Sequence, residues 1–359
     1  MPPDIPRRLR RAPTVPVPSA VAQRLEASPL QAIDVGAARG VPPHWLPFLH
    51  HLRVDAFEPN RKECERLASQ SPPNVSWHPT GLAGSEGTRD LHVLATPTGS
   101  SFFPPAPDFV ELFGIPSYSE VVEVASLPCT TLAAHLDRKA TPVVHALKLD
   151  TQGSELEILR GLRPEQLAAV QSIEIEVELH EAYLGQPLFP EVHAFLTDAG
   201  LSLLDFRVQR AHLTDGVEER HFLKRDLGTA VGTPHLTAQA HAVDALYVRP
   251  LRHVAALEDE HEAARAMLIL QMYQYYDGLF WLVEHGSWAK SLGEQARIAL
   301  TEGYRRAAPR PRFLERTGAL PHAIRRARRG ASFVLEEIAG LTGFDPPRVF
   351  WSRAYWPDQ

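Results

Sequence analysis

A carboxylate and two glycines follow the first apolar run of the chain. Asp34, Gly36 and Gly40 lie within the string Ile-Asp-Val-Gly-Ala-Ala-Arg-Gly, which begins at residue 33. A glycine directly after a strand allows a sharp turn and lets a ligand approach the backbone closely. In an open parallel sheet, ligands bind at the carboxyl ends of the strands. The string therefore predicts a ligand-binding turn, although a simple tight turn would have the same sequence.

A second acid stands at the end of the next predicted strand. Glu58 follows Gly36 by 22 positions and precedes Pro59 and Asn60. A carboxylate at this spacing can accept hydrogen bonds from both hydroxyls of a ribose. The alternative interpretation is a helix-capping acid, because Asn60 is itself a typical capping residue. Together the two strings predict a nucleoside site.

The loop after the first strand disfavours a dinucleotide. A dinucleotide site requires G-x-G-x-x-G, with a pyrophosphate at the start of the following helix. Ala38 replaces the second glycine of that pattern, and Pro42 and Pro43 restrict the helix start. The loop suits an amino-acid moiety better than a pyrophosphate, so a nicotinamide-dependent oxidoreductase is the less favoured alternative.

A third string, Leu-Lys-Leu-Asp-Thr-Gln-Gly-Ser-Glu at residues 147–155, ends the strongest predicted strand. It resembles the signature of the FkbM family of S-adenosylmethionine-dependent methyltransferases, in which a strand ends in K-[IL]-D. The resemblance continues through residues 126–132, 173–189 and 244–248, and it covers about residues 31–250. Two departures stand out: Gln152 replaces a common glutamate, and the loop at 80–84 lacks the acid that often binds the adenine amine.

The resemblance implies S-adenosylmethionine as the cofactor and a class I methyltransferase fold. That fold is an α/β, Rossmann-like, doubly wound sheet of seven strands, here with a C-terminal helical extension. Asp34 and the glycines would lie around the methionine part, Glu58 on the ribose, the 81–82 loop near adenine, and Asp150 near the sulfonium and the acceptor. The residues expected at the cofactor are, in chain order, Asp34, Gly36, Ala37, Gly40, Glu58, Pro59, Asn60, Gly81, Leu82, Asp150 and Gln152.

The strand predicted for residues 172–180 alternates glutamates with apolar residues. Glu174 and Glu176 are expected to form a solvated or salt-bridged face. Glu178 and His180 lie at the carboxyl end, where an acceptor hydroxyl needs a base. We predict His180 as that base, oriented by Glu178, with Asp150 near the cofactor; a structural loop histidine is the alternative. No metal is expected, although Asp150, Glu178 and His180 could together bind a divalent cation.

Composition divides the chain into three parts. Residues 1–28 are rich in proline and arginine and are expected to form a flexible arm. Residues 29–250 alternate strand and helix patterns, as parallel α/β domains do. Residues 251–359 carry helical patterns at 254–285, 291–307 and 331–341. Phe102, Phe103 and Phe109 lie in a Ser/Pro-rich insertion, where they could line an acceptor pocket or pack in the core or a lid.

Bulk composition narrows the function class. The net charge of −6 would not attract nucleic acid. No apolar run approaches the roughly 20 residues that a membrane span requires. The two cysteines, Cys64 and Cys129, suggest no disulfide framework, so we expect a cytoplasmic protein. The predicted function is O-methylation of a sugar, glycan or natural product; the alternative is a catalytically silent S-adenosylmethionine-binding scaffold. The C-terminal helices could join two copies of the chain.

Overall fold

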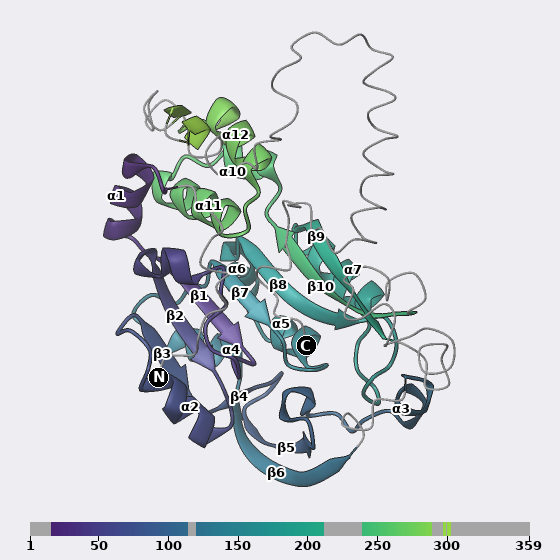
Figure 1. Ribbon diagram of the computed structural model, residues 1–359. Helices are drawn as coiled ribbons and strands as arrows, with labels where there is room; N and C mark the ends of the chain where they lie inside the picture. Colours follow the sequence, from purple (N-terminus) through teal and green to yellow (C-terminus); the bar gives the residue numbers. More distant parts are fainter. Residues whose placement is uncertain (1–15, 114–119, 212–238, 289–296, 299, 303–359) are drawn as a thin grey trace, which may run out of the picture.

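The computed structural model describes residues 16–113, 120–211, 239–288, 297–298 and 300–302 (Figure 1). Its main feature is a seven-stranded sheet in the order β3-β2-β1-β7-β8-β10-β9. From β3 to β8 the neighbours are parallel, whereas β10 runs antiparallel between β8 and β9. The strands are β1 (Leu30–Val35), β2 (Leu52–Phe57), β3 (Val75–His78), β7 (Ala146–Leu149), β8 (Ser172–Glu178), β9 (Ser202–Ala211) and β10 (Gln239–Val248). This is the strand order of class I methyltransferases, so the predicted fold is confirmed.

One face of the sheet packs against helices that follow β6, β7 and β8 in the chain. These helices are α4 (Leu132–Asp137), α5 (Glu155–Arg160), α6 (Pro164–Ala169) and α7 (Phe189–Asp198). Because side chains alternate along a strand, the odd-numbered residues of β1 and β8 point to this side. Ile33, Val35, Ile173, Ile175 and Val177 are all buried in its core.

The other face is covered by segments from both ends of the described chain. These are α1 (Ser19–Ala27), the 3-10 helix η2 (Leu46–His51), α10 (Leu251–Ala255), α11 (Glu260–Met272) and α12 (Tyr276–His285). Figure 1 shows α1 beside α11, with α10 and α12 close by. Every residue of α11 from 263 to 272 is buried, as expected for a helix enclosed on all sides. The C-terminal helices therefore form part of the domain core.

Helix α1 corrects the predicted flexible arm at residues 1–28. Val21 and Leu25 of this helix are completely buried, and they belong to the same core cluster as α11. The guanidinium of Arg24 also donates to the carboxylate of Glu260. The arm prediction is therefore wrong for residues 19–27, because apolar packing against α11 and the contact of Arg24 with Glu260, 236 positions away in the chain, stabilise this short helix. Residues 1–15 lie outside the described part of the chain.

A second, three-stranded sheet lies beside the carboxyl ends of the main one, in the order β4-β6-β5. Its strands are β4 (Gly81–Leu82), β5 (Gly87–Leu94) and β6 (Val121–Thr130), and the short helices η3 (Pro97–Gly99) and α3 (Pro107–Phe113) follow β5. Phe109 is buried in a small cluster with Phe113 and Tyr183, and Phe103 packs against it. The core alternative therefore holds for Phe109.

Helix α2 (Arg61–Ala68) lies beside β3 and buries Cys64 and Leu67.

The helical pattern predicted at 254–285 is confirmed by α11 and α12. The patterns at 291–307 and 331–341 fall largely or wholly outside the described residues. Within the described ranges, no helix is long and apolar enough to cross a membrane.

Candidate cofactor and active site

The turn after β1 closes tightly against the end of β7. Gly36 has φ +80°, and a Cβ there would lie 1.9 Å from the carbonyl oxygen of Asp150. The amides of Gly36 and Ala37 donate to the carbonyl of Phe57 at 3.1 and 3.0 Å. Gly40, with φ +87°, follows, and its amide donates to the carbonyl of Ala37. Because no side chain fits at Gly36, only glycine lets the carboxyl ends of β1, β2 and β7 meet here.

A row of alternating charges crosses the buried sheet. Asp34 of β1, Lys148 of β7 and Glu174 of β8 are neighbours in register. Lys148 Nζ lies 3.6 Å from Asp34 Oδ1 and 3.4 Å from Asp150 Oδ2. Burial raises the pKa of Asp34 to about 6, and Lys148 partly opposes that rise. Burial lowers the pKa of Lys148, but the surrounding carboxylates outweigh it and raise the pKa overall, so the ammonium stays charged.

Of the solvated or salt-bridged face predicted for β8, the salt-bridged alternative holds for Glu174 and the solvated one does not. Its side chain is 2% exposed, accepts a hydrogen bond from the Tyr273 hydroxyl at 2.8 Å, and lies 3.1 Å from His44 Nε2. Glu176 is half-buried and accepts hydrogen bonds from the side-chain amides of Gln152 and Gln209 at 2.8 and 2.6 Å. Both glutamates are therefore held by polar partners inside the protein.

Glu58 stands directly after β2 and is buried. Its Oε1 accepts a hydrogen bond from the Asn60 amide at 2.8 Å, and Asn60 Oδ1 caps α2 by accepting from the Glu63 amide at 3.2 Å. Burial is the main cause that raises the pKa of Glu58. The residue that caps α2 is therefore Asn60, and Glu58 contacts the backbone of that capping residue. The carboxyl group nevertheless lies at the end of β2, beside the turn that Gly36 makes.

The predicted adenine loop forms the short strand β4. Gly81 and Leu82 pair in parallel with Cys129 and Thr130 of β6. A Cβ at Gly81 would lie 2.8 Å from Cys129 Sγ and 2.9 Å from Phe102, so close packing requires glycine. The side chain of Leu82 is buried in the core. Any contact that this strand makes with a ligand must therefore come from its backbone.

Gln152 connects the ends of β7 and β8 through its side chain. It has φ +59°, and its Nε2 donates to Asp150 Oδ1 at 3.1 Å and to Glu176 Oε2 at 2.8 Å. Its Oε1 accepts a hydrogen bond from the Tyr183 hydroxyl at 2.8 Å. A glutamate here would add a third carboxylate and could donate no hydrogen, whereas the amide satisfies both acids. Sequence reasoning missed Tyr183 and Glu176 as partners, because neither belongs to a short motif.

Asp150 is the exposed acid of this group. One third of its side-chain surface is accessible, whereas Asp34 is 1% exposed. Burial raises the pKa of Asp150, but Lys148 and the hydrogen bonds outweigh it and leave the pKa below its ordinary value. Asp150 is therefore ionised at neutral pH and faces accessible space at the end of β7.

The structure does not bring Glu178 and His180 together as predicted. Strand β8 ends at Glu178, whose Oε2 accepts a hydrogen bond from Gln186 Nε2 at 2.7 Å. His180 lies in the following turn, with its Nε2 3.0 Å from Nε2 of Gln239. Burial, followed by repulsion from Glu155, raises the pKa of Glu178 to about 8. The prediction that Glu178 orients His180 is therefore wrong, because Gln186 occupies the carboxylate.

The chemistry of these residues fits S-adenosylmethionine. Asp34 Oδ1 is buried, accepts no hydrogen bond within the described residues, and lies 3.6 Å from the Lys148 ammonium, so it can accept a further donor. Glu58 offers a carboxylate to ribose hydroxyls at the end of the neighbouring strand. Between them, the Gly36 turn exposes backbone rather than a side chain. These are the groups that a zwitterionic nucleoside requires.

Comparison with solved structures finds similar methyltransferases at low identity. A TehB-like S-adenosylmethionine-dependent methyltransferase from Corynebacterium glutamicum is 10% identical, with a TM-score of 0.28, over 64% of this chain and 88% of that one. The 1,6-didemethyltoxoflavin-N1-methyltransferase of Burkholderia thailandensis is 13% identical, with a TM-score of 0.27, over 65% and 79%. The 16S rRNA (adenine(1408)-N(1))-methyltransferase from Catenulisporales acidiphilia is 15% identical, with a TM-score of 0.27, over 65% and 92%. Likeness at this level carries no conclusion about this chain.

No curated protein matches the sequence. The family comparison, in contrast, matches the methyltransferase FkbM domain over residues 34–203. The match begins at Asp34 in β1 and includes Glu58, Asp150 and Glu178, and it agrees with the class I sheet order. The cofactor of this domain is S-adenosylmethionine. Residues 34–203 of the chain thus belong to the FkbM family of S-adenosylmethionine-dependent methyltransferases.

Proposed function

We propose that the protein transfers a methyl group to a hydroxyl oxygen of a sugar, glycan or natural product. The observation that carries this proposal is the Asp150 carboxylate, which is ionised and one third exposed at the end of β7. The backbone of Asp150 packs against Gly36, so the carboxylate stands beside the cofactor turn. A hydroxyl that reaches this point meets a charged acceptor for its proton.

We assign the cofactor-binding roles to residues at this same edge of the sheet. Glu58 accepts from the ribose hydroxyls, and Asp34 accepts from the amino group of the methionine part. The Gly36–Gly40 turn leaves room for that part, and Gly81 contributes backbone contacts to adenine. The support for Asp34 is its buried Oδ1 atom, which accepts no hydrogen bond from the described residues although Lys148 Nζ lies 3.6 Å away. The support for Glu58 is its position directly after β2.

The chemistry needs one proton acceptor and a fixed approach. S-adenosylmethionine supplies an electrophilic methyl group on a sulfonium. When bound, the cofactor would give this methyl group to the acceptor oxygen, which would then have to lose its proton. The Asp150 carboxylate, whose pKa is lowered, would take that proton. Lys148 Nζ at 3.4 Å and Gln152 Nε2 at 3.1 Å hold the Asp150 carboxylate in place. A fixed carboxylate also orients the hydroxyl for in-line displacement.

The class of methyl acceptor is inferred from the hydrogen-bonding groups around Asp150. Carboxylates accept several hydrogen bonds each, which suits a compound with several hydroxyls. His180 lies two residues beyond β8, and we assign it to the acceptor rather than to the cofactor. Glu178 is buried, and burial raises its pKa to about 8, which leaves it a supporting role.

Turnover with a panel of hydroxylated acceptors tests the proposal. Asp150→Asn should lower turnover by roughly 10²–10⁴-fold, the usual range for general acid–base catalysis, with cofactor affinity unchanged. His180→Ala should raise the KM for the acceptor while leaving turnover largely intact. Asp198→Asn, an exposed acid at the end of α7, is the matched control.

Two outcomes would overturn parts of this proposal. If His180→Ala produces the large loss of turnover and Asp150→Asn does not, the base is the histidine. If the wild-type protein binds the cofactor tightly yet methylates no acceptor, the silent-scaffold alternative gains support. Gln152 is not an argument for that alternative, because its amide satisfies Asp150 and Glu176.

A further inference from the structure

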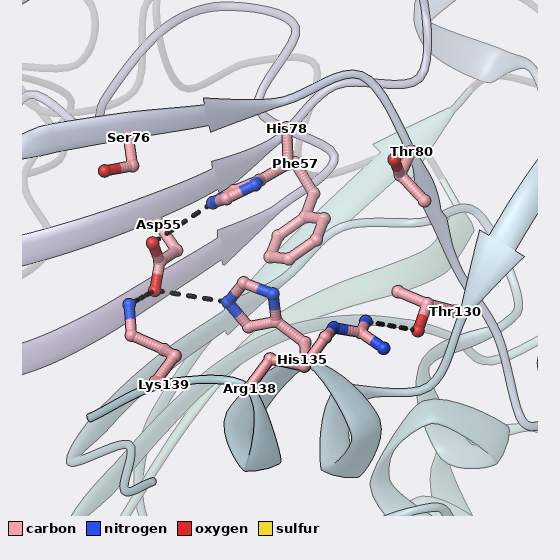
Figure 2. Close-up of a pocket in the computed structure, with 9 residues that line it drawn as sticks. All are labelled: Asp55, Phe57, Ser76, His78, Thr80, Thr130, His135, Arg138 and Lys139. Carbon is pink, nitrogen blue, oxygen red and sulfur yellow. Dashed lines mark hydrogen bonds and ion pairs between the residues drawn. The ribbon is translucent and has the colours of Figure 1, made fainter. Parts of the chain in front are cut away.

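A second polar cluster lies on the α4 face of the sheet. Figure 2 shows Asp55 of β2 between two imidazoles, His78 at the end of β3 and His135 of α4. Asp55 Oδ1 lies 3.1 Å from His78 Nε2, and Asp55 Oδ2 lies 3.3 Å from His135 Nε2. The three donor atoms all lie within 4.8 Å of one another. No short motif links the three positions, so the sequence did not indicate them.

The cluster is held by packing on its inner side. The Phe57 ring stacks on His78 with centroids 4.8 Å apart and meets the edge of His135 at 4.9 Å. Asp55 is 5% exposed and Phe57 is 1% exposed, so the inner wall is closed. Both rings therefore have fixed orientations, and both direct Nε2 to the same carboxylate.

The outer side of the cluster is open. A pocket of about 490 Å³ is lined by Asp55, His78 and His135 together with Lys139, Arg138, Thr80 and three further residues. The ammonium of Lys139 pairs with Asp55 Oδ2. Figure 2 shows Lys139 reaching the carboxylate from α4's side of the pocket. About a quarter of the Lys139 side chain is exposed, so it can swing into solvent.

We propose that Asp55, His78 and His135 bind a zinc ion. Two imidazole nitrogens and one carboxylate oxygen are a zinc ligand set, whereas calcium and magnesium prefer oxygen ligands. Ligands of a tetrahedral zinc ion lie about 3.3 Å apart, since each is roughly 2.0 Å from the metal. One donor atom from each of the three residues already lies within 4.8 Å of the other two, so small side-chain rotations bring them to that spacing. Water from the open pocket supplies the fourth ligand, and Lys139 leaves the carboxylate when the ion binds.

Zinc titration of chelator-treated full-length protein tests this site. The wild-type chain should take up one equivalent tightly, and cobalt(II) should give the strong visible absorption of a tetrahedral site. Asp55→Asn, His78→Ala and His135→Ala should each weaken zinc binding by roughly 100-fold or more, because even indirect ligand partners contribute 10–100-fold. His253→Ala, an exposed histidine of α10, is the matched control and should change nothing.

Lys139→Met separates a metal site from a purely structural ion-pair cluster. The ammonium competes with zinc for Asp55 Oδ2, so its removal should tighten zinc binding by roughly fivefold, the equivalent of one weak ion pair. Circular dichroism and unfolding curves establish that each variant folds. His135→Gln keeps a polar side chain of similar size, and it replaces His135→Ala if the latter unfolds.

Two results would overturn the zinc site. The first is zinc affinity that is the same in the wild type and in folded Asp55→Asn, which would locate binding on other histidines. The second is weaker zinc binding in Lys139→Met, which would show that Lys139 supports the cluster rather than competing with the ion. Neither result depends on methyl transfer. The zinc site is therefore tested independently of the proposed reaction.

Discussion

The hydroxyl of Tyr273 donates a hydrogen bond to Oε2 of Glu174 at 2.8 Å, between residues 99 positions apart. Tyr273 directly follows α11, and Glu174 lies in the middle of β8, beside Lys148 in register. His44 contacts the same carboxylate oxygen at 3.1 Å. The C-terminal helices therefore reach the row of charges that extends to Asp34. Residues 251–288 thus contribute to the interior of the methyltransferase domain.

Tyr273→Phe should destabilise the protein by about 1.5–3 kcal/mol, the range for a hydrogen bond to a charged group. Tyr247→Phe is the matched control, because its buried hydroxyl lies 3.0 Å from His193 Nδ1, away from the charge row. That control should lose only about 0.5–1.5 kcal/mol. Urea unfolding measures both. Equal losses of unfolding free energy in the two variants would show that the hydrogen bond from Tyr273 to Glu174 is no stronger than one between neutral groups.

Gly36→Ala should prevent the ends of β1 and β7 from closing, because its Cβ would lie 1.9 Å from a backbone oxygen. Gly185→Ala is the comparison: Gly185 has φ +78°, but nothing lies within 4 Å of a Cβ there. That variant should lose only the backbone strain, about 1–2 kcal/mol. Thermal unfolding and cofactor titration of both variants separate strain from clash. If Gly36→Ala is no worse than Gly185→Ala, the tight closure is not required.

Glu58→Ala should weaken binding of S-adenosylhomocysteine by roughly 10–150-fold, which corresponds to about 1.5–3 kcal/mol. Calorimetric titration measures the dissociation constant, and NAD should not bind. Glu65→Ala, an exposed acid on the adjacent helix α2, is the control. A folded Glu58→Ala variant with unchanged affinity would limit Glu58 to its contact with Asn60.

Glu178 should make stability depend on pH. Its folded pKa is about 8 against an ordinary value of 4.5, so folding takes up a proton between these values. The stabilisation from Glu178 is therefore complete below pH 4.5 and is lost as the pH rises toward 8. Glu178→Gln mimics the protonated form, so its stability relative to wild type should rise across this window, by a few kcal/mol at roughly 1.4 per pH unit. Unfolding curves at pH 5 and 8 check this; a constant difference would refute the raised pKa.

Local patterns predicted most of the domain. Strand β8 spans Ser172–Glu178, within the strand predicted for residues 172–180, and Asn60 caps α2, as expected for a typical capping residue at that position. These features depend on neighbours in the sequence, which is why pattern and spacing reveal them. The Gly36 turn was predictable for the same reason, since a glycine after a strand has few other uses.

Side-chain partnerships were less predictable. Glu178 and His180 are two positions apart, which suggested a pair, yet Gln186 and Gln239 are their partners. The turn after β8 brings Gln186 back to Glu178, and strand β10 begins at Gln239, 59 positions from His180. The partner of each side chain depends on how the chain folds back in these turns and strands. No local sequence pattern encodes that folding.

The sequence by itself determined the local features of the sheet. These are the apolar runs that form strands, the glycine turn after β1, and the acids at the ends of β2 and β7. The sequence determines them because periodicity and turn chemistry act over a few residues. Tertiary structure alone decided that α1 and α11 close one face of the sheet, that Tyr273 reaches Glu174, and that His78 and His135 meet at Asp55. Such contacts join residues far apart in the chain, so they exist only once the sheet has assembled and its strands have fixed their neighbours.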